Sequence, residues 1–254
     1  MAGHRIRMPP LRRVLLDLLH FSKKMPLVTA ERRLALGPLL AARQACAAKP
    51  TWSAIFMKAF ALVAQRRAEL RRVYCSFPWA HFYEFDESVG CWTVERELAQ
   101  EAVVLFGRCR APDRQTLSEL SNCVRAYQER PVETLKTFRR MRRMAYLPTF
   151  LRRLLWNYAR FVGGRSWINN FGTFGLSSTA AHGAGLATIL SITTSTLHCG
   201  LFDAHGNLDF RLTFDHRVYD GAFAARVLTE IEAALLGAVL AELRSMSGIK
   251  SAVA

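Results

Sequence analysis

The cysteines of this sequence form no recognisable pattern. None of the six stands in a Cys-x-x-Cys pair, and none has a histidine at the spacing of a metal site. The sequence therefore offers neither a disulfide framework nor a metal centre. We expect reduced thiols in a cytoplasmic protein, with attachment to the periphery of a membrane as the alternative.

Long apolar runs are also missing. No stretch reaches the roughly 18 consecutive apolar residues that a transmembrane helix needs. Residues 1–24 are basic and leucine-rich, as in an organellar targeting segment, but they show no cleavage signal. We therefore predict that this segment contributes the first helix of the fold.

Acidic residues are few in comparison with basic ones. The chain has 35 Lys and Arg residues but only 20 Asp and Glu residues, which gives a net charge of +15. This surplus favours an anionic partner or substrate, such as nucleic acid, a membrane surface, the phosphates of coenzyme A or an acidic carrier protein. Because no helix-turn-helix and no aromatic-basic stacking module is evident, we expect no nucleic-acid binding.

Apolar residues, in contrast, are sufficient for a full core. The 254 residues, 51% of them hydrophobic, fit one large domain that spans residues 1–254. Their periodicity predicts helices over 11–20, 37–48, 54–65, 116–127 and 222–244, and strands over 27–36, 77–85, 88–95, 102–109, 186–194 and 208–214.

One short stretch concentrates ionisable residues between a predicted strand and a predicted helix. Asp215, His216, Arg217 and Asp220 stand within six residues, and such a junction can hold a histidine ring in a fixed direction. The stretch also has an ordinary interpretation, because Asp220 is a good helix N-cap and a single histidine is more often structural than catalytic. The histidines at 182, 198 and 205 belong to no motif, and we expect them at the surface or in packing.

Two motifs resemble those of the catalytic domain of dihydrolipoyl acyltransferases, the core subunits of 2-oxoacid dehydrogenase complexes. Residues 215–221, Asp-His-Arg-Val-Tyr-Asp-Gly, are similar to that family's Asp-His-Arg-x-x-Asp-Gly, of which chloramphenicol acetyltransferase has a looser form. Residues 167–175, Trp-Ile-Asn-Asn-Phe-Gly-Thr-Phe-Gly, are similar to its Thr-Ile-Ser-Asn-Leu-Gly-x-Phe-Gly. The helical segment 52–63 is similar as well, so the resemblance covers most of residues 11–244.

The resemblance implies a fold, an assembly and a reaction. The fold is α/β, a two-layer sandwich of the chloramphenicol acetyltransferase type in which helices cover a mixed sheet, and the assembly is a homotrimer with active sites between subunits. The reaction moves an acyl group from acyl-coenzyme A, or from a phosphopantetheine carrier, to a hydroxyl, amine or thiol without a metal. His216 is then the general base. Asp220 supports its loop by pairing with an arginine, and Arg217 is structural.

The sequence departs from the family at the oxyanion donor. Asn169 stands where the family has a serine or threonine hydroxyl, and an asparagine amide can also donate to an oxyanion. Asn169 therefore either replaces the hydroxyl or indicates reduced activity, although Asn169 and Asn170 are also typical of a turn. The hydroxyls of Thr173, Ser177 and Ser178 are close in sequence and are weaker candidates for the same role.

Another departure concerns domain organisation. We expect a stand-alone catalytic domain, because no lipoyl domain precedes the motifs in this sequence. Two alternatives stay open: an acyltransferase that acts in trans on a separate lipoyl domain, and an inactive relative that serves as a structural or docking subunit. Asn169 is the best support for the inactive relative.

The segment 131–163 is rich in arginine and has no counterpart of this kind in the family. Its apolar residues fall at helical spacing, which predicts an amphipathic helix. Such a helix either packs on its own domain with a solvated basic face or docks an anionic partner. We predict docking through the arginines, with a membrane surface slightly ahead of an acyl carrier protein; the arginines are Arg139, Arg140, Arg142, Arg143, Arg152 and Arg153.

Overall fold

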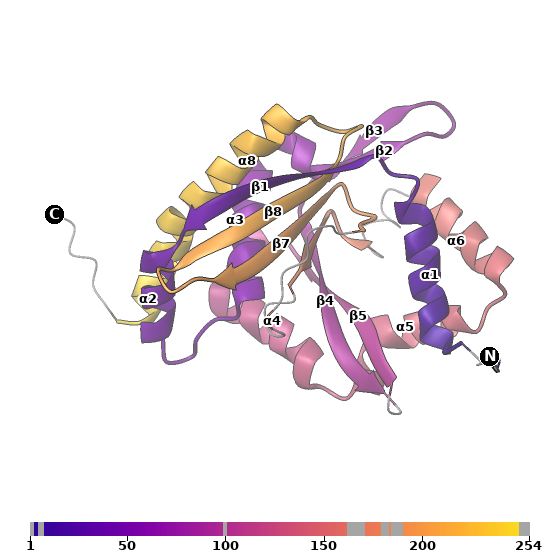
Figure 1. Ribbon diagram of the computed structural model, residues 1–254, viewed down its shortest axis with the longest axis horizontal. Helices are drawn as coiled ribbons and strands as arrows, with labels where there is room; N and C mark the ends of the chain where they lie inside the picture. The colour runs from indigo at the N-terminus through magenta and orange to yellow at the C-terminus, as the bar shows by residue number, and fades with distance from the viewer. Residues whose placement is uncertain are drawn as a thin grey trace.

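A six-stranded mixed sheet runs through the centre of the molecule (Figure 1). The computed structural model describes residues 3–4, 8–98, 101–161, 171–178, 183 and 190–248. The strands, in the order β1-β8-β7-β6-β4-β5 across the sheet, are β1 (Leu27–Ala35), β8 (Asn207–Asp215), β7 (Ser195–Phe202), β6 (Phe174–Ser177), β4 (Val89–Leu98) and β5 (Glu101–Arg110). β6 pairs parallel with both β4 and β7, and the other neighbours are antiparallel. A separate hairpin joins β2 (Arg72–Cys75) to β3 (His81–Glu84).

One group of helices covers one face of this sheet. The group consists of α2 (Gly37–Ala45), α3 (Trp52–Arg66), α4 (Leu117–Glu129), α8 (Gly221–Ala234) and α9 (Leu240–Met246). A π-helical turn, Leu235–Val239, joins α8 to α9. Short 3-10 turns occupy Ala68–Arg71, Pro112–Arg114 and Val132–Thr134.

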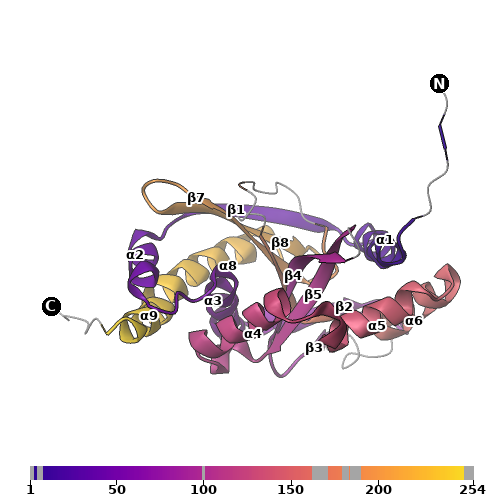
Figure 2. The ribbon, with the colours of Figure 1, turned by 90° about the horizontal axis from the view of Figure 1, so that it is seen from below.

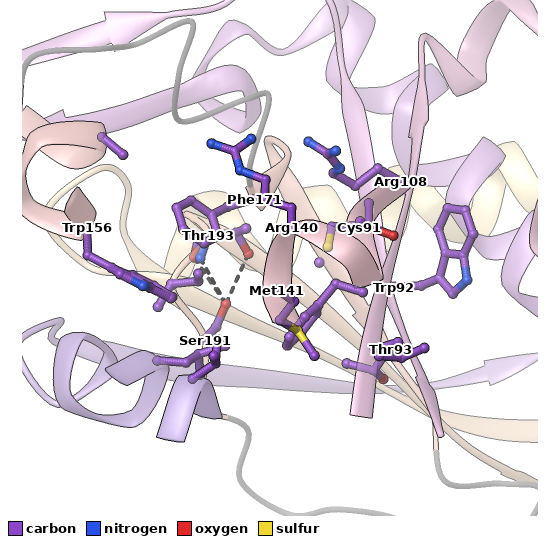
Figure 3. Close-up of a pocket in the computed structure, with 18 of the residues that line it drawn as sticks. Cys91, Trp92, Thr93, Arg108, Arg140, Met141, Trp156, Phe171, Ser191 and Thr193 are labelled. Atoms are coloured by element: carbon purple, nitrogen blue, oxygen red, sulfur yellow. Dashed lines mark hydrogen bonds between the residues drawn. The ribbon is translucent and has the colours of Figure 1, made fainter. Parts of the chain in front are cut away.

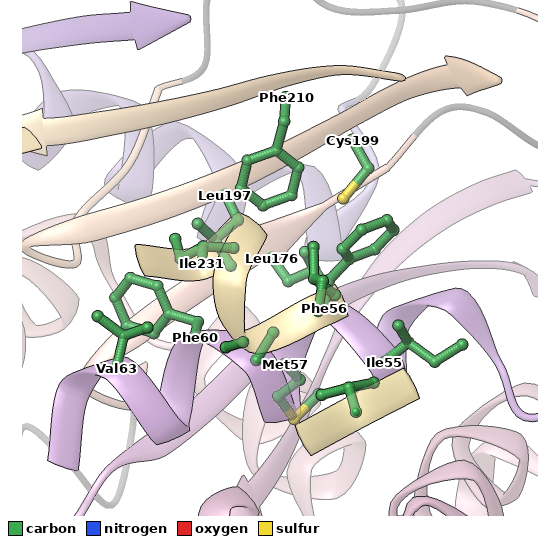
Figure 4. Close-up of a cluster of buried hydrophobic side chains, with 14 of the residues drawn as sticks. Ile55, Phe56, Met57, Phe60, Val63, Leu176, Leu197, Cys199, Phe210 and Ile231 are labelled. Carbon is green, nitrogen blue, oxygen red and sulfur yellow. The ribbon is translucent and has the colours of Figure 1, made fainter. Parts of the chain in front are cut away.

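The helix α3 lies at the centre of the main core. It begins where the Thr51 hydroxyl accepts a hydrogen bond from Ala54 N, and apolar residues follow on nearly every side, as expected of a buried helix. Phe56 packs on Phe210 of β8, with ring centroids 5.4 Å apart, and Phe60 packs on Phe174 of β6 at 4.4 Å. Figure 4 shows these side chains between α3 and the strands. The helix therefore fixes the two strands that precede and follow the predicted catalytic motifs.

A second group of helices lies at the opposite end of the molecule from α2 and α9 (Figures 1 and 2). It consists of α1 (Pro10–Ser22), α5 (Lys136–Ala145) and α6 (Thr149–Phe161). Phe21 of α1 stacks on Trp156 of α6 at 5.3 Å between centroids. Beside them, Arg152 Nε donates to Asp17 Oδ2 at 2.5 Å, and both side chains are buried. An ion pair and an aromatic stack thus hold α6 to α1.

Most predicted elements are confirmed, with several differences. Of the strand predicted over 186–194, residues 186–189 lie outside the described residues and 190–194 lie in a bend that precedes β7 at Ser195. The cause is local, because the hydroxyls of Ser191 and Thr193 bond the backbone N–H of Thr193 and the carbonyl of Ser195 and so compete with a strand ladder. The predicted strand 77–85 is shorter, and its partner β2 was not predicted. No helix among the described residues is both long and apolar enough to cross a membrane.

The start of β6 is anchored to the start of β4. Thr173 N donates to the carbonyl of Val89 at 2.8 Å, and the Thr173 hydroxyl accepts from Val89 N at 2.9 Å. Gly172 has a φ of +76°, and a Cβ at this position would lie 2.6 Å from the Val89 oxygen. Only glycine meets both the left-handed backbone and the close approach.

The buried ion pair between α1 and α6 makes a quantitative prediction. Asp17→Ala should lower the free energy of unfolding by about 3 kcal/mol, because it leaves the Arg152 charge buried without its carboxylate. The matched control is Glu232→Ala, which removes the more exposed pair with Arg32 and should cost less than about 1 kcal/mol. Urea unfolding measures both, and equal effects would contradict the assignment.

The anchor of β6 makes a second prediction. Gly172→Ala should lower the free energy of unfolding by roughly 1–3 kcal/mol, because alanine strains the left-handed backbone and meets the Val89 oxygen. Gly221→Ala is the control, since a Cβ there meets no atom within 4 Å. Thermal unfolding should separate the two variants. If Gly172→Ala unfolds at the same temperature as the parent, the segment before β6 is not held in this way.

Candidate active site

The loop that carries His216 is built on a buried carboxylate. Asp215, at the end of β8, is 1% exposed, and its oxygens accept from Arg217 Nε at 2.9 Å and from a terminal guanidinium nitrogen at 2.6 Å. The Arg217 guanidinium also lies over the Tyr74 ring, 4.5 Å from its centroid. A bidentate pair of this kind fixes direction as well as distance. Arg217 is therefore a structural residue of the loop, as the sequence predicted.

His216 itself is at the surface of the chain. Its side chain is exposed, its backbone N donates to the carbonyl of Pro26 at 3.0 Å, and its ring lies against Phe214 with centroids 5.7 Å apart. The backbone is thus fixed while the imidazole can meet another molecule. Within the described residues, no cluster of three or more His, Cys, Asp or Glu could hold a metal ion beside it.

The far end of the same loop starts α8. The Asp220 carboxylate accepts from Phe223 N at 2.8 Å, which is a helix N-cap. The resemblance implies an unspecified arginine partner for Asp220, but the arginine of the same loop, Arg217, pairs with Asp215. Between these residues the buried Tyr219 hydroxyl bonds Ser195 Oγ at 2.7 Å, and burial raises the pKa of this phenol. Asp220 therefore supports the loop by capping a helix.

The second predicted motif is only partly described. Asn169 and Asn170 lie outside the described residues, whereas 171–178 are described. The Thr173 hydroxyl is occupied by Val89, which removes it from the candidate oxyanion donors. Ser177 points to the opposite face of β6 from the buried Phe174 and Leu176, and it lines a cavity.

This cavity, of about 510 Å³, lies between the sheet and the second group of helices (Figure 3). Its walls come from α1, α5 and α6, from β4, β5, β6 and β7, and from the bend 190–194. Phe171, two residues after Asn169, is part of the wall, so the cavity adjoins the second motif. His216 is not among the residues that line it.

The inner wall carries polar groups that satisfy each other. Ser191 Oγ lies 2.5 Å from Thr196 Oγ1 and 3.0 Å from Thr193 Oγ1, and all three side chains are buried. Cys91 also lines the cavity, and burial raises the pKa of its thiol to about 12. A thiol that is neutral at cellular pH is a poor nucleophile, so Cys91 is not suited to carry an acyl group.

Two arginines border the cavity. Arg140 is exposed and Arg108 is partly buried, and Figure 3 shows their guanidinium groups next to one another. Burial is the main cause that lowers the pKa of Arg108, and the positive charges of Arg140 and Arg110 lower it further, although nearby Cys91 and Tyr127 oppose this. The site therefore combines an apolar interior with concentrated positive charge at its border.

The remaining histidines are packing or surface residues where they are described. His198 on β7 is fully buried, and burial is the main cause that lowers its pKa, with nearby Arg211 acting in the same direction. His205 is exposed in the turn between β7 and β8. His182 lies outside the described residues.

The arginine-rich helices differ from the predicted arrangement in one respect. Arg139, Arg140, Arg142, Arg143 and Arg153 are exposed as predicted, but the prediction that Arg152 belongs to a docking surface is wrong. Arg152 is 3% exposed because Asp17 binds it. The opposite side of α6 instead exposes an apolar ridge that consists of Phe150, Leu154 and Tyr158. The ridge residues are four apart, so they share one face of the helix.

The cavity could not be predicted from the sequence, because no local pattern of residues specifies it. Its lining residues come from eight separate segments between residues 14 and 196. One available signal was the alternation in β6 and β7, where Gly175, Ser177, Thr196 and His198 face away from the core. Polar or small residues on the second face of a central strand indicate that something other than core covers that face.

Comparison with known proteins shows the fold. No family model matches the sequence, and no curated protein matches it significantly. A probable dihydrolipoamide acetyltransferase from Listeria monocytogenes 4b F2365 has a TM-score of 0.66 at 15% identity, covering 92% of this chain and 95% of that one. A truncated catalytic core of the 2-oxoacid dehydrogenase multienzyme complex from Thermoplasma acidophilum has a TM-score of 0.67 at 15% identity, covering 92% and 99%.

Chloramphenicol acetyltransferase is similar too, with a TM-score of 0.50 at 14% identity, covering 86% of this chain and 94% of that one. Identities this low establish a common fold. The predicted two-layer α/β sandwich is therefore confirmed, and the chain has the fold of dihydrolipoamide acetyltransferase catalytic cores and of chloramphenicol acetyltransferase.

Proposed function

We propose that the chain is an acyltransferase. It takes an acyl group from a thioester, either acyl-coenzyme A or an acyl carrier protein, and passes it to a hydroxyl, amine or thiol. The observation that carries the proposal is the His216 loop, in which a buried Asp215–Arg217 pair and the Asp220 cap present an exposed imidazole at a fixed strand end. The fold shared with dihydrolipoamide acetyltransferase catalytic cores supports it, because both sequence motifs resemble those of dihydrolipoyl acyltransferases.

The chemistry is a direct transfer without a covalent enzyme intermediate. His216 removes the proton from the acceptor, whose oxygen, nitrogen or sulfur attacks the thioester carbonyl carbon. Asn169 donates a hydrogen bond to the tetrahedral oxyanion. When the intermediate collapses, the carbon–sulfur bond breaks and the histidine returns its proton to the departing thiolate. The raised pKa of Cys91 agrees with a route that needs no cysteine nucleophile.

We further propose that the site is completed by a second copy in a homotrimer. His216 is exposed and does not line the cavity of its own chain, which supports a partner that brings a substrate channel to it. A solved structure with this fold is the cubic core of the pyruvate dehydrogenase multienzyme complex, a symmetric assembly, with a TM-score of 0.66 at 18% identity. Closed rotational symmetry repeats such an interface at every subunit.

The proposed surface partner is an anionic membrane. The exposed ridge of α6, formed by Phe150, Leu154 and Tyr158, lies on the helix that follows the arginine-rich α5, and Arg153 of α6 is exposed as well. Apolar and aromatic side chains beside basic ones are typical of a helix that lies in a lipid headgroup layer. An acyl carrier protein is the less favoured partner, because a charged carrier explains the arginines but leaves the apolar ridge uncovered.

The assignment of His216 is tested by its removal. His216→Ala should lower transfer roughly 10²–10⁴-fold, because the acceptor then loses its base. The matched control is His205→Ala, an exposed histidine in the turn between β7 and β8, which should retain full activity. The assay follows thiol release from a panel of acyl-coenzyme A donors with alcohol, amine and dihydrolipoamide acceptors. Equal rates for His216→Ala and the parent would refute the assignment.

Membrane docking predicts salt-sensitive binding to anionic vesicles. The triple variant Arg139→Gln, Arg142→Gln, Arg143→Gln should bind roughly a hundredfold more weakly, since each basic residue near the surface contributes about 1 kcal/mol. The control triple variant changes exposed arginines elsewhere, Arg114, Arg226 and Arg244, to Gln and removes the same charge. Co-sedimentation at low salt measures both. Equal loss in the two variants would mean that overall charge, and not this surface, binds the vesicle.

A further inference from the structure

We propose that the cavity beneath α1, α5 and α6 binds a linear aliphatic chain that ends in an anionic group, with the chain in the apolar interior and the anion on Arg108 and Arg140. This binding is distinct from the acyl transfer proposed above, because it requires neither an acyl donor nor an acyl acceptor.

The size and lining of the cavity suit such a chain. Its volume of about 510 Å³ lies within the range of roughly 300–1,000 Å³ that is typical of small-molecule pockets. Aliphatic, aromatic and sulfur-containing side chains line most of it, among them Met141 and Met144 of α5. Methionine side chains are flexible and adapt to the shape of an apolar ligand.

The hydroxyl groups of the inner wall do not make the cavity suitable for a polar ligand. Ser191, Thr193 and Thr196 bond one another, and Thr193 Oγ1 also donates to the carbonyl of Ser195 at 2.8 Å. Their hydrogen-bonding capacity is largely used within the protein, so they offer little to a polar ligand. A hydrocarbon chain can lie against them without leaving a donor unpaired.

The wall of the cavity also contains a buried hydrogen-bond donor that lacks an acceptor among the described residues. Trp156 is 4% exposed, and its Nε1 makes no hydrogen bond with any described residue. A buried indole N–H without an acceptor costs free energy, which a ligand oxygen within reach would recover. The occupant is therefore expected to carry oxygen and is not a pure hydrocarbon.

The entrance of the cavity is largely apolar. Leu155, Tyr158 and Leu190 both line the cavity and are 44–60% exposed, so they form an apolar mouth. Tyr158 also belongs to the exposed ridge of α6, which makes the mouth continuous with the surface proposed to meet a membrane. A chain can thus enter from a lipid layer without crossing water.

The arginines at the border lack a counter-charge. Among the residues whose side chains are described, no carboxylate lies within ion-pair distance of Arg108 or Arg140. Two adjacent guanidinium groups, one of them partly buried, are costly unless an anion neutralises them. A carboxylate or a phosphate supplies that charge with geometry that arginine matches well.

The test is calorimetric titration of the full chain with sodium alkanoates from hexanoate to dodecanoate. Affinity should rise about fourfold for each added methylene and stop rising once the chain fills the cavity. Decanoate should bind roughly tenfold or more tightly than 1-decanol, and decyltrimethylammonium least of all. Decyl phosphate distinguishes the source of the anion: tighter binding than decanoate indicates a lipid phosphate, and weaker binding indicates a fatty acid; both outcomes support the site.

Variants locate the binding. Arg140→Gln should lower decanoate affinity about tenfold and leave 1-decanol unchanged, whereas Arg244→Gln, an exposed arginine of α9 that does not line the cavity, should match the parent. Arg108→Gln repeats the test if Arg140→Gln fails to fold, as judged by thermal unfolding. Met141→Trp should shorten the chain at which affinity stops rising. No saturable binding, equal affinity for decanoate and decyltrimethylammonium, or equal losses in Arg244→Gln and Arg140→Gln would overturn the proposal.

Discussion

Side-chain alternation along the central strands is the constraint on which the molecule depends. In β6, β7 and β8 the residues Phe174, Leu197 and Phe214 turn to one face and join the core beneath α3 and α8. Their neighbours Gly175, Thr196 and Thr213 necessarily turn to the other. One face of the sheet thus packs in the hydrophobic core, and the other face is available for polar groups and for ligand binding.

Different helices cover the two faces of the sheet. The core face is closed by helices with fitted apolar side chains, whereas α1, α5 and α6 stand over part of the other face and leave a cavity. Asp17 and Arg152 hold these helices together through a buried ion pair, which a packed apolar contact could replace at little cost in stability. The pair fixes α6 in one rotation, with Trp156 inside and the Phe150 ridge outside. The ion pair therefore determines which side chains of α6 line the cavity and which are exposed on the surface.

Local patterns predicted the parts of this arrangement that depend on neighbours in sequence. The apolar periodicity of α3 and α4, the N-cap at Asp220 and the loop around His216 all follow from residues a few positions apart. The bend before Ser195 was missed because apolar residues outweighed Ser191 and Thr193, whose hydroxyls bond the backbone. The burial of Arg152 could not be predicted, since its partner lies 135 positions away. The cavity depends on many such distant contacts and on the space they leave.

The most direct test of the proposed site is complementation between two inactive variants, His216→Ala and Asn169→Ala. If each site takes its base from one subunit and its oxyanion donor from another, mixed trimers contain intact sites. Random exchange of equal amounts should then restore about a quarter of the parent activity. No recovery from mixed trimers, with their mixed composition verified by native mass spectrometry, would contradict a site shared between subunits.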